Sequence, residues 1–161
     1  MKKILLMLSI FSLSFTGTVY MAYDFDETEN MTLGYNHTFK TWTCEESGKP
    51  CWVLAGGMNY DVVAEDVGFA SIYALPMKPV TDKMALWASL GYATATEGNW
   101  DGGLTYGLGL HYNLTETCGM GIGMVSHNVE YSGTVDLLGI PIPVTIEDTL
   151  EKMNLFFSYK F

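Results

Sequence analysis

Large apolar residues alternate with small or polar residues, with a period of two, over most of the chain after residue 18. The clearest run spans residues 104–112. One face carries Leu104, Tyr106, Leu108, Leu110 and Tyr112, and the other carries Thr105, Gly107, Gly109 and His111. A period of two is that of an extended strand, whose successive side chains point to opposite sides. Glycines inside a helix would weaken it, so the run predicts a strand between two different environments.

The same alternation, interrupted by clusters of turn-forming residues, predicts seven strands. They span residues 31–41, 52–60, 67–76, 83–95, 102–113, 118–131 and 150–161. An eighth strand at 19–25 makes the number even, as is normal for closed bacterial outer-membrane barrels. We expect residues 61–66 and 132–148 to be loops. The second contains Pro141 and Pro143, and proline lacks the amide hydrogen that a central strand requires.

The two faces of the predicted strands favour a membrane barrel over a soluble sandwich. A sandwich also alternates, but the strand face that meets water normally carries many charges. Here only 16% of residues are charged, and they concentrate in the turns. The seven strands from 31–41 to 150–161 also supply the ~9–11 residues that a membrane-crossing strand needs. We therefore predict an all-β fold, an eight-stranded antiparallel up-and-down transmembrane β-barrel. Its large apolar residues, with Phe69, Ser71, Tyr73 and Leu75 as a weaker set, face outward. A soluble exported β-sandwich remains the alternative.

The first residues are typical of an export signal. Lys2 and Lys3 precede an apolar run from Ile4 to Phe15, which is too short to span a bilayer as a helix. Cleavage near Gly17 or Thr18 leaves the eighth strand intact, whereas cleavage at Ala22 would remove part of it. We predict a signal peptide at 1–18, with cleavage as late as 22 as the alternative, and a barrel domain at 19–161.

Charge narrows the possible partners and suggests which end of the barrel faces outward. The 8 basic residues are all Lys, against 18 acidic residues, so the net charge is -10. Nucleic-acid binding is therefore not expected, because it needs clustered positive charge. With both termini in the periplasm, the predicted outer loops carry most of the acids, including Asp24, Asp61 and Glu151. The other end carries Lys40, Lys49, Lys78, Lys83 and Lys160.

Three cysteines are present. Cys44 and Cys51 flank a turn-rich segment, and in an oxidising compartment this spacing predicts a short-loop disulfide. A zinc site is a weaker interpretation, because there is no CxxC pair and the three histidines are scattered. Cys118 is left over and is interpreted as a small apolar residue. We expect no metal and no cofactor.

One segment contains residue types used in nucleophilic catalysis. Ser126, His127 and Glu130 could act as nucleophile, base and orienting acid in a lipid-modifying enzyme. Adjacent residues on a strand point to opposite faces, so Ser126 and His127 are not expected to share a site. We therefore predict no catalytic residues, with a lipid A-modifying barrel enzyme as an alternative.

The second half of the chain resembles the small outer-membrane β-barrel family of the OmpA/OmpX type. The residues that carry this resemblance are the C-terminal run 155–161, the segment 107–115, and residues 80–83 followed by 90–93. In that family the terminal aromatic and its alternating neighbours form the assembly signal, which Phe157, Tyr159 and Phe161 match. The resemblance implies a bacterial outer-membrane location, a barrel-insertion machinery as partner during biogenesis, and contact with outer-membrane lipids and lipopolysaccharide.

The expected role is structural or surface-interacting, in adhesion or membrane integrity, and we expect a monomer. A small passive pore is the other alternative, but eight-stranded barrels are filled by side chains.

Overall fold

The computed structural model describes residues 17–25, 30–45, 48–64, 67–96, 100–137 and 140–161, and these residues are almost entirely β-structure. The strands are β1 (Gly17–Asp24), β2 (Met31–Thr43), β3 (Pro50–Ala64), β4 (Val67–Pro79), β5 (Met84–Ala95), β6 (Trp100–Asp101), β7 (Leu104–Asn113), β8 (Cys118–Leu137) and β9 (Ile140–Lys160). Within the described ranges no helix is long and apolar enough to cross a membrane.

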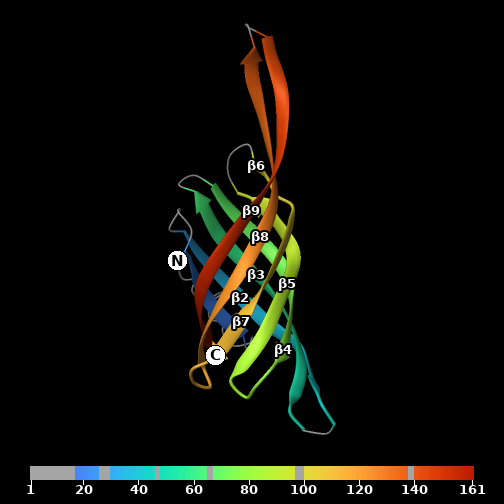
Figure 1. Cartoon of the computed structure of the whole chain (residues 1–161), viewed down its shortest axis with the longest axis vertical. Coiled ribbons are helices and arrows are strands. Elements are labelled where there is room, and N and C mark those ends of the chain that lie inside the picture. The colour runs from blue at the N-terminus through green and yellow to red at the C-terminus, as the bar shows by residue number, and fades with distance from the viewer. Residues whose placement is uncertain (1–16, 26–29, 46–47, 65–66, 97–99, 138–139) are drawn as a thin grey trace, which may run out of the picture.

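Eight of these strands form a closed antiparallel ring, which confirms the predicted barrel. Sequential neighbours pair from β1 to β5, then β5 with β7, β7 with β8 and β8 with β9, and β6 is a two-residue addition to β8. The ring closes because β1 pairs with β9, from Thr18 opposite Lys160 to Asp24 opposite Asn154. Closure leaves no free edge around the barrel, as hydrocarbon requires for every backbone polar group. Figure 1 shows the strands wrapped around one axis.

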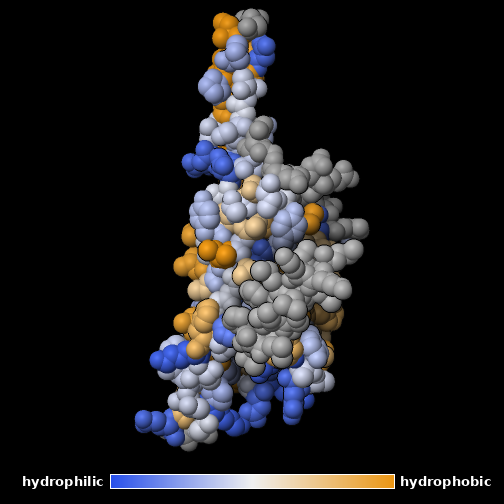
Figure 2. Space-filling view, turned by 180° about the vertical axis from the view of Figure 1, so that it is seen from behind, coloured by the Kyte–Doolittle hydropathy of each residue, from blue (hydrophilic) through white to orange (hydrophobic). Residues whose placement is uncertain are grey.

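The outward face is apolar, as the alternation predicts. Leu33, Ile72 and Leu108 are each more than half exposed. Figure 2 shows apolar surface along the barrel wall, with hydrophilic residues at its lower end. Such a belt is expected of a barrel that meets lipid.

The prediction was wrong for one strand. Phe69, Ser71, Tyr73 and Leu75 face the lumen, where Phe69 lies opposite Asp61 and Tyr73 opposite Gly57. The two faces of β4 are both largely apolar, because Ala70, Ile72 and Ala74 alternate with the lumen-facing set. Hydrophobicity alone therefore did not distinguish inside from outside, and the pairing with β3 decided it.

Large aromatic rings inside the lumen lie over glycines of the neighbouring strands. Gly109 and Gly123 lie side by side on β7 and β8, and a Cβ at Gly123 would overlap the Trp87 ring. Gly121 accommodates Phe156 in the same way. The Trp87 and Phe156 rings pack edge to face, with centroids 5.9 Å apart. The small residues of the alternating pattern thus make room for aromatic residues from β5 and β9.

The segment predicted as the longest loop is instead a hairpin. β8 and β9 stay paired from Cys118 opposite Tyr159 to Leu137 opposite Ile140, without a register shift. Beyond the pairing of Tyr131 with β6, the two strands continue alone as the outer hairpin, residues 132–137 and 140–145. Figure 1 shows it rising well beyond the rest of the barrel, at the end opposite the C-terminus. At ~3.4 Å per residue its free part is about 20 Å long.

Prolines did not end the strand, because they lie where no partner needs their amide. The Met153 carbonyl accepts a hydrogen bond from the Phe25 amide on the β1 side, at 2.9 Å. The odd-numbered residues of β9 therefore direct their backbone groups away from β8. Pro141 and Pro143 are odd-numbered, so their missing amides fall on the free edge, where proline is tolerated.

We expect Gly123→Val to destabilise the barrel by about 1–3 kcal/mol, because the added side chain displaces the Trp87 ring. The measurement is the free energy of unfolding in urea, in detergent micelles. Trp87→Leu supplies the control, because the double variant should lose less stability than the sum of the two single variants. Additive losses would show that the glycine does not accommodate the ring.

Candidate functional site

Four ionisable side chains meet inside the lumen near the hairpin end of the barrel. Asp24 is the last residue of β1, and Asp61 lies near the end of β3. His127 is in β8 and Lys152 is in β9. Each occupies an inward position of an alternating strand, so the closed ring directs all four toward the axis. All four are buried, and His127 has 0% exposure. We call Asp24, Asp61, His127 and Lys152, with Thr32, the ion cluster.

Lys152 holds the ion cluster together. Its ammonium donates to Asp24 Oδ2 at 2.9 Å and to Asp61 Oδ1 at 2.8 Å, and it also donates to the Val62 carbonyl at 3.1 Å. Three donors thus meet three acceptors, which uses the full capacity of an ammonium group. A buried charge is tolerated only when it is paired and hydrogen-bonded, and this arrangement satisfies both conditions.

Asp61 is the acceptor shared by Lys152, Thr32 and His127. Its Oδ1 also accepts from the Thr32 hydroxyl at 2.8 Å, and its Oδ2 lies 2.9 Å from His127 Nε2. An ionised carboxylate can only accept a hydrogen bond, so this contact requires a hydrogen on Nε2, which the imidazole donates. The ion cluster therefore joins residues of five strands, β1, β2, β3, β8 and β9, across the lumen, which fixes the relative positions of those strands.

An apolar cap lies over the ion cluster. Phe69, Ala93 and Val129 are buried together, with Ala95, Trp100 and Leu150 packed against them. The Phe69 ring stacks on His127 with an interplanar angle of 10° and centroids 5.9 Å apart. The cap and the ion cluster together fill the hairpin end of the lumen with side chains.

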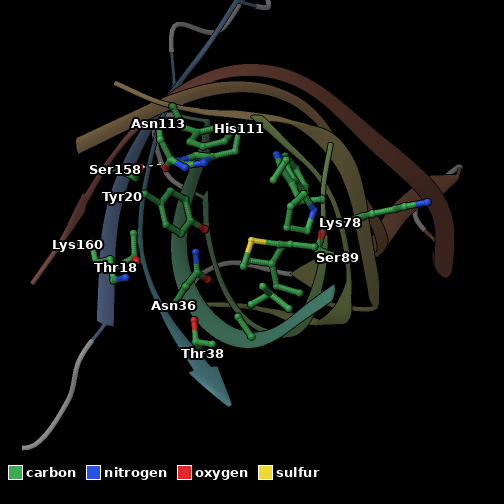
Figure 3. A pocket seen from close by; sticks show the side chains of 18 of the residues that line it. Thr18, Tyr20, Asn36, Thr38, Lys78, Ser89, His111, Asn113, Ser158 and Lys160 are labelled. Carbon is green, nitrogen blue, oxygen red and sulfur yellow. Dashed lines mark hydrogen bonds between the residues drawn. The ribbon is translucent and has the colours of Figure 1, made fainter. Parts of the chain in front are cut away.

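Below the ion cluster the lumen holds a cavity of about 1340 Å³. Asp61, Thr32 and Asn154 line its inner end, and Lys49, Asp82 and Lys160 line its mouth. In Figure 3 the Tyr20, Asn36 and His111 side chains point into the cavity, whereas Lys78 points away from it. The Tyr73 hydroxyl donates to Asn36 Oδ1 at 2.7 Å and lies 2.8 Å from the Tyr20 hydroxyl. The cavity is thus open at the termini end and closed by the ion cluster.

The candidate catalytic residues do not form a site. His127 points into the lumen toward Asp61, whereas Ser126 lies on the other face, between Tyr106 and Glu151 of the neighbouring strands. Glu130 shares the outward face with Ser126. His127 is fully buried beneath the Phe69 ring, and its imidazole contacts Asp61, not Ser126 or Glu130. Among the described residues, no group of three or more His, Cys, Asp or Glu side chains could hold a metal ion.

The other predicted site residues lie at the termini end. Cys44 and Cys51 are joined by a disulfide across the β2–β3 turn, with Cα atoms 5.5 Å apart. Cys118 is an exposed free thiol at the start of β8. Phe157, Tyr159 and Phe161 are about half exposed on the outer wall.

Sequence reasoning missed the ion cluster by assigning Asp24 and Asp61 to outer loops. Both lie in strands and are buried, because each has the inward parity of its strand. Asp24 follows Tyr20 and Ala22, and Asp61 follows Asn59, all of which face the lumen. A charged residue at an inward position is costly unless a partner neutralises it. The inward positions of Asp24, Asp61 and Lys152 were the signal in the sequence from which a buried ion cluster could have been predicted.

Comparison with known proteins finds related folds but no related sequence family. No protein-family model and no curated protein sequence matches the chain. A designed transmembrane β-barrel has a TM-score of 0.52 and 11% identity, with 91% of this chain and 95% of the other covered. The Yersinia pestis outer membrane protein Ail, solved in a phospholipid bilayer nanodisc, has a TM-score of 0.50 and 14% identity, with 92% and 100% covered.

The outer membrane enzyme PagL aligns with a TM-score of 0.48 and 14% identity, over 89% of this chain and 99% of the other. That score is too low to support an inference about activity. The first two likenesses agree with the ring seen here, and the chain has the fold of a small transmembrane β-barrel.

We expect Lys152→Met to destabilise the barrel by about 3–5 kcal/mol, because it leaves two buried carboxylates without their cation. The measurement is again urea unfolding. Lys49→Met is the matched control: it breaks an exposed pair with Asp82, 2.6 Å long, which contributes at most about 1 kcal/mol. Equal losses for the two variants would contradict the role given to Lys152.

We also expect the purified protein to form no steady channel in planar lipid bilayers, because the ion cluster and its cap fill one end of the lumen. The measurement is single-channel current under an applied voltage, compared with protein-free membranes. Reproducible conductance steps from the folded protein would show that ions pass the cluster.

Proposed function

We propose that the protein is a bacterial outer-membrane barrel that contacts molecules or surfaces outside the cell through its outer hairpin. The observation that carries this proposal is the length of β8 and β9. Their pairing continues to Leu137 opposite Ile140, far past the point where the neighbouring strands end. Crossing a bilayer needs only ~9–11 residues per strand, so these two strands exceed what anchoring requires.

The interior supports a surface role for the protein and not transport through the barrel. Its hairpin end is filled by the ion cluster and the Phe69 cap, which join strands from across the ring. Scaffolds of this kind hold functional segments at a fixed position above the membrane. In our proposal the barrel is the anchor and the outer hairpin is the binding element.

The proposed location is supported by several features of the chain. The outer wall is apolar, and the fold is that of transmembrane barrels. Residues 1–18 have the pattern of an export signal, and of these residues 1–16 lie outside the described part of the chain. In this proposal the termini face the periplasm and the barrel-insertion machinery reads Phe157, Tyr159 and Phe161 during assembly. The outer wall would contact lipids and lipopolysaccharide, and the barrel would act as a monomer.

We expect that shortening the hairpin abolishes surface attachment while leaving the barrel intact. The variant joins Tyr131 to Ile146, which are cross-strand partners, through an Asn-Gly turn in place of 132–145. Cells that express either protein are compared for retention on epithelial cell layers and on protein-coated surfaces.

Outer-membrane fractionation and heat-dependent gel mobility verify that the shortened barrel still assembles. Retention of cells carrying the shortened, assembled barrel at the level of the full-length protein would overturn the proposed function.

A further inference from the structure

The outer hairpin has one face made almost entirely of aliphatic side chains. Cross-strand partners share a face, so the register gives both faces directly. The aliphatic face carries the pairs Val135–Ile142 and Leu137–Ile140, with Gly133–Val144 and Tyr131–Ile146 below them. The opposite face carries Thr134–Pro143, Asp136–Pro141, Ser132–Thr145 and Glu130–Glu147. The hairpin is therefore amphipathic across its thickness.

The aliphatic face continues the lumen side of β8 and β9 beyond the barrel, where neither lipid nor lumen covers it. Leu137 is 58% exposed and Ile140 is 65% exposed. Val135, Ile142 and Ile146 are each more than two-fifths exposed. A continuous apolar surface of this kind on a protein in water marks an interaction site.

Strand addition at an edge would not cover this face. Pro141 and Pro143 remove two donors from the free edge of β9, and proline on an edge blocks pairing with another strand. A strand added along β8 would lie beside the aliphatic face and leave it in water. The occupant must therefore lie across the face.

Charge identifies the chemistry of that occupant. The sequence from 118 to 151 has no Lys or Arg and five acidic residues. Asp148 lies on the aliphatic face itself, at its base, because it is opposite the lumen-facing Val129. A second copy of the hairpin would bring the same negative charge, and an anionic lipid surface would also repel it.

A row of acids behind the face adds to the negative potential. Asp101 lies opposite Glu130, which in turn lies opposite Glu147, so three carboxylates are neighbours across β6, β8 and β9. Like charges directly opposite each other destabilise a sheet, and a cation brought by a partner would relieve this repulsion. The ribbon is only two strands wide, so long basic side chains reach past its edges toward these carboxylates.

We propose that the aliphatic face of the outer hairpin binds a polypeptide segment whose own apolar stripe is flanked by Lys or Arg, as in a basic amphipathic helix. This inference rests on the proposed function and names the partner chemistry of the same hairpin. The aliphatic pairs supply contact area, and Asp148 with the acidic row selects a basic partner over a neutral or acidic one.

The test uses the full-length protein in nanodiscs of zwitterionic lipid. The probe is a fluorescent helical peptide built from Leu and Lys, and its Leu–Glu counterpart is the charge-reversed control. Fluorescence anisotropy is compared with empty nanodiscs. We expect the Lys peptide to bind the protein above the lipid background, the Glu peptide not to bind, and the Lys peptide to bind more weakly at high salt.

Two variants separate the contributions of the face. Val135→Thr with Ile142→Thr keeps β-branched residues in the strands and should weaken binding about tenfold, because two aliphatic contacts become polar. Thr134→Ser with Thr145→Ser, on the opposite face, is the matched control and should bind as the original chain does. Asp148→Asn should weaken binding several-fold. Unchanged heat-dependent gel mobility verifies that each variant is folded.

Three results would overturn the inference: equal binding of the Lys and Glu peptides, undiminished binding by the Val135/Ile142 variant, or self-association that depends on these two residues. Failure here is distinguishable from failure of the proposed function. If only the partner chemistry is wrong, cells with the shortened hairpin lose attachment while cells with the Val135/Ile142 variant keep it.

Discussion

The requirement that every backbone polar group inside a membrane be paired within the protein determines the structure of this chain. It is met by the ladder between the first and last strands, in which Thr18 to Asp24 pair with Lys160 to Asn154. With that ladder in place the sheet has no edge around the barrel, and every strand has a defined inside and outside. The apolar wall, the filled lumen and the burial of the ion cluster all depend on this closure.

Closure creates a narrow interior that the chain fills in two different ways. In the middle, glycines on β7 and β8 leave space for Trp87 and Phe156, so dispersion contacts and burial of ring surface stabilise the fold. Near the hairpin end the filling is ionic, with Lys152 between Asp24 and Asp61. Buried ion pairs gain little net free energy over apolar packing, but removing one partner is costly. The cluster therefore specifies one arrangement of strands around the lumen.

The outer hairpin is the part of the molecule that closure does not explain. Within the described part of the chain its strands pair only with each other beyond Tyr131, and one of its faces is aliphatic although it extends beyond the barrel wall. An isolated two-stranded ribbon is only marginally stable in water, so continuous pairing with the barrel part of β8 and β9 supports it. Exposing such a surface costs free energy in the unbound protein, and we propose that a partner covers it. In this proposal the acidic character of the same region selects a basic partner.

The sequence alone determined that the chain is built of strands, that most of them have an apolar outer face, and that an even number of them closes the ring. Side-chain alternation is a local property, so the two faces of a run such as 104–112 can be assigned from its own sequence.

The tertiary structure decided which strands are neighbours and which of their side chains meet, because the local pattern does not specify either. Asp24, Asp61 and Lys152 meet only because the ring brings β1, β3 and β9 around one lumen, a relation between residues up to 128 positions apart. The orientation of Phe69 and Tyr73 depended on pairing with β3, because both faces of β4 are largely apolar. Pro141 and Pro143 became compatible with a strand because their amide positions face a free edge, and whether an edge is free is a property of the whole sheet.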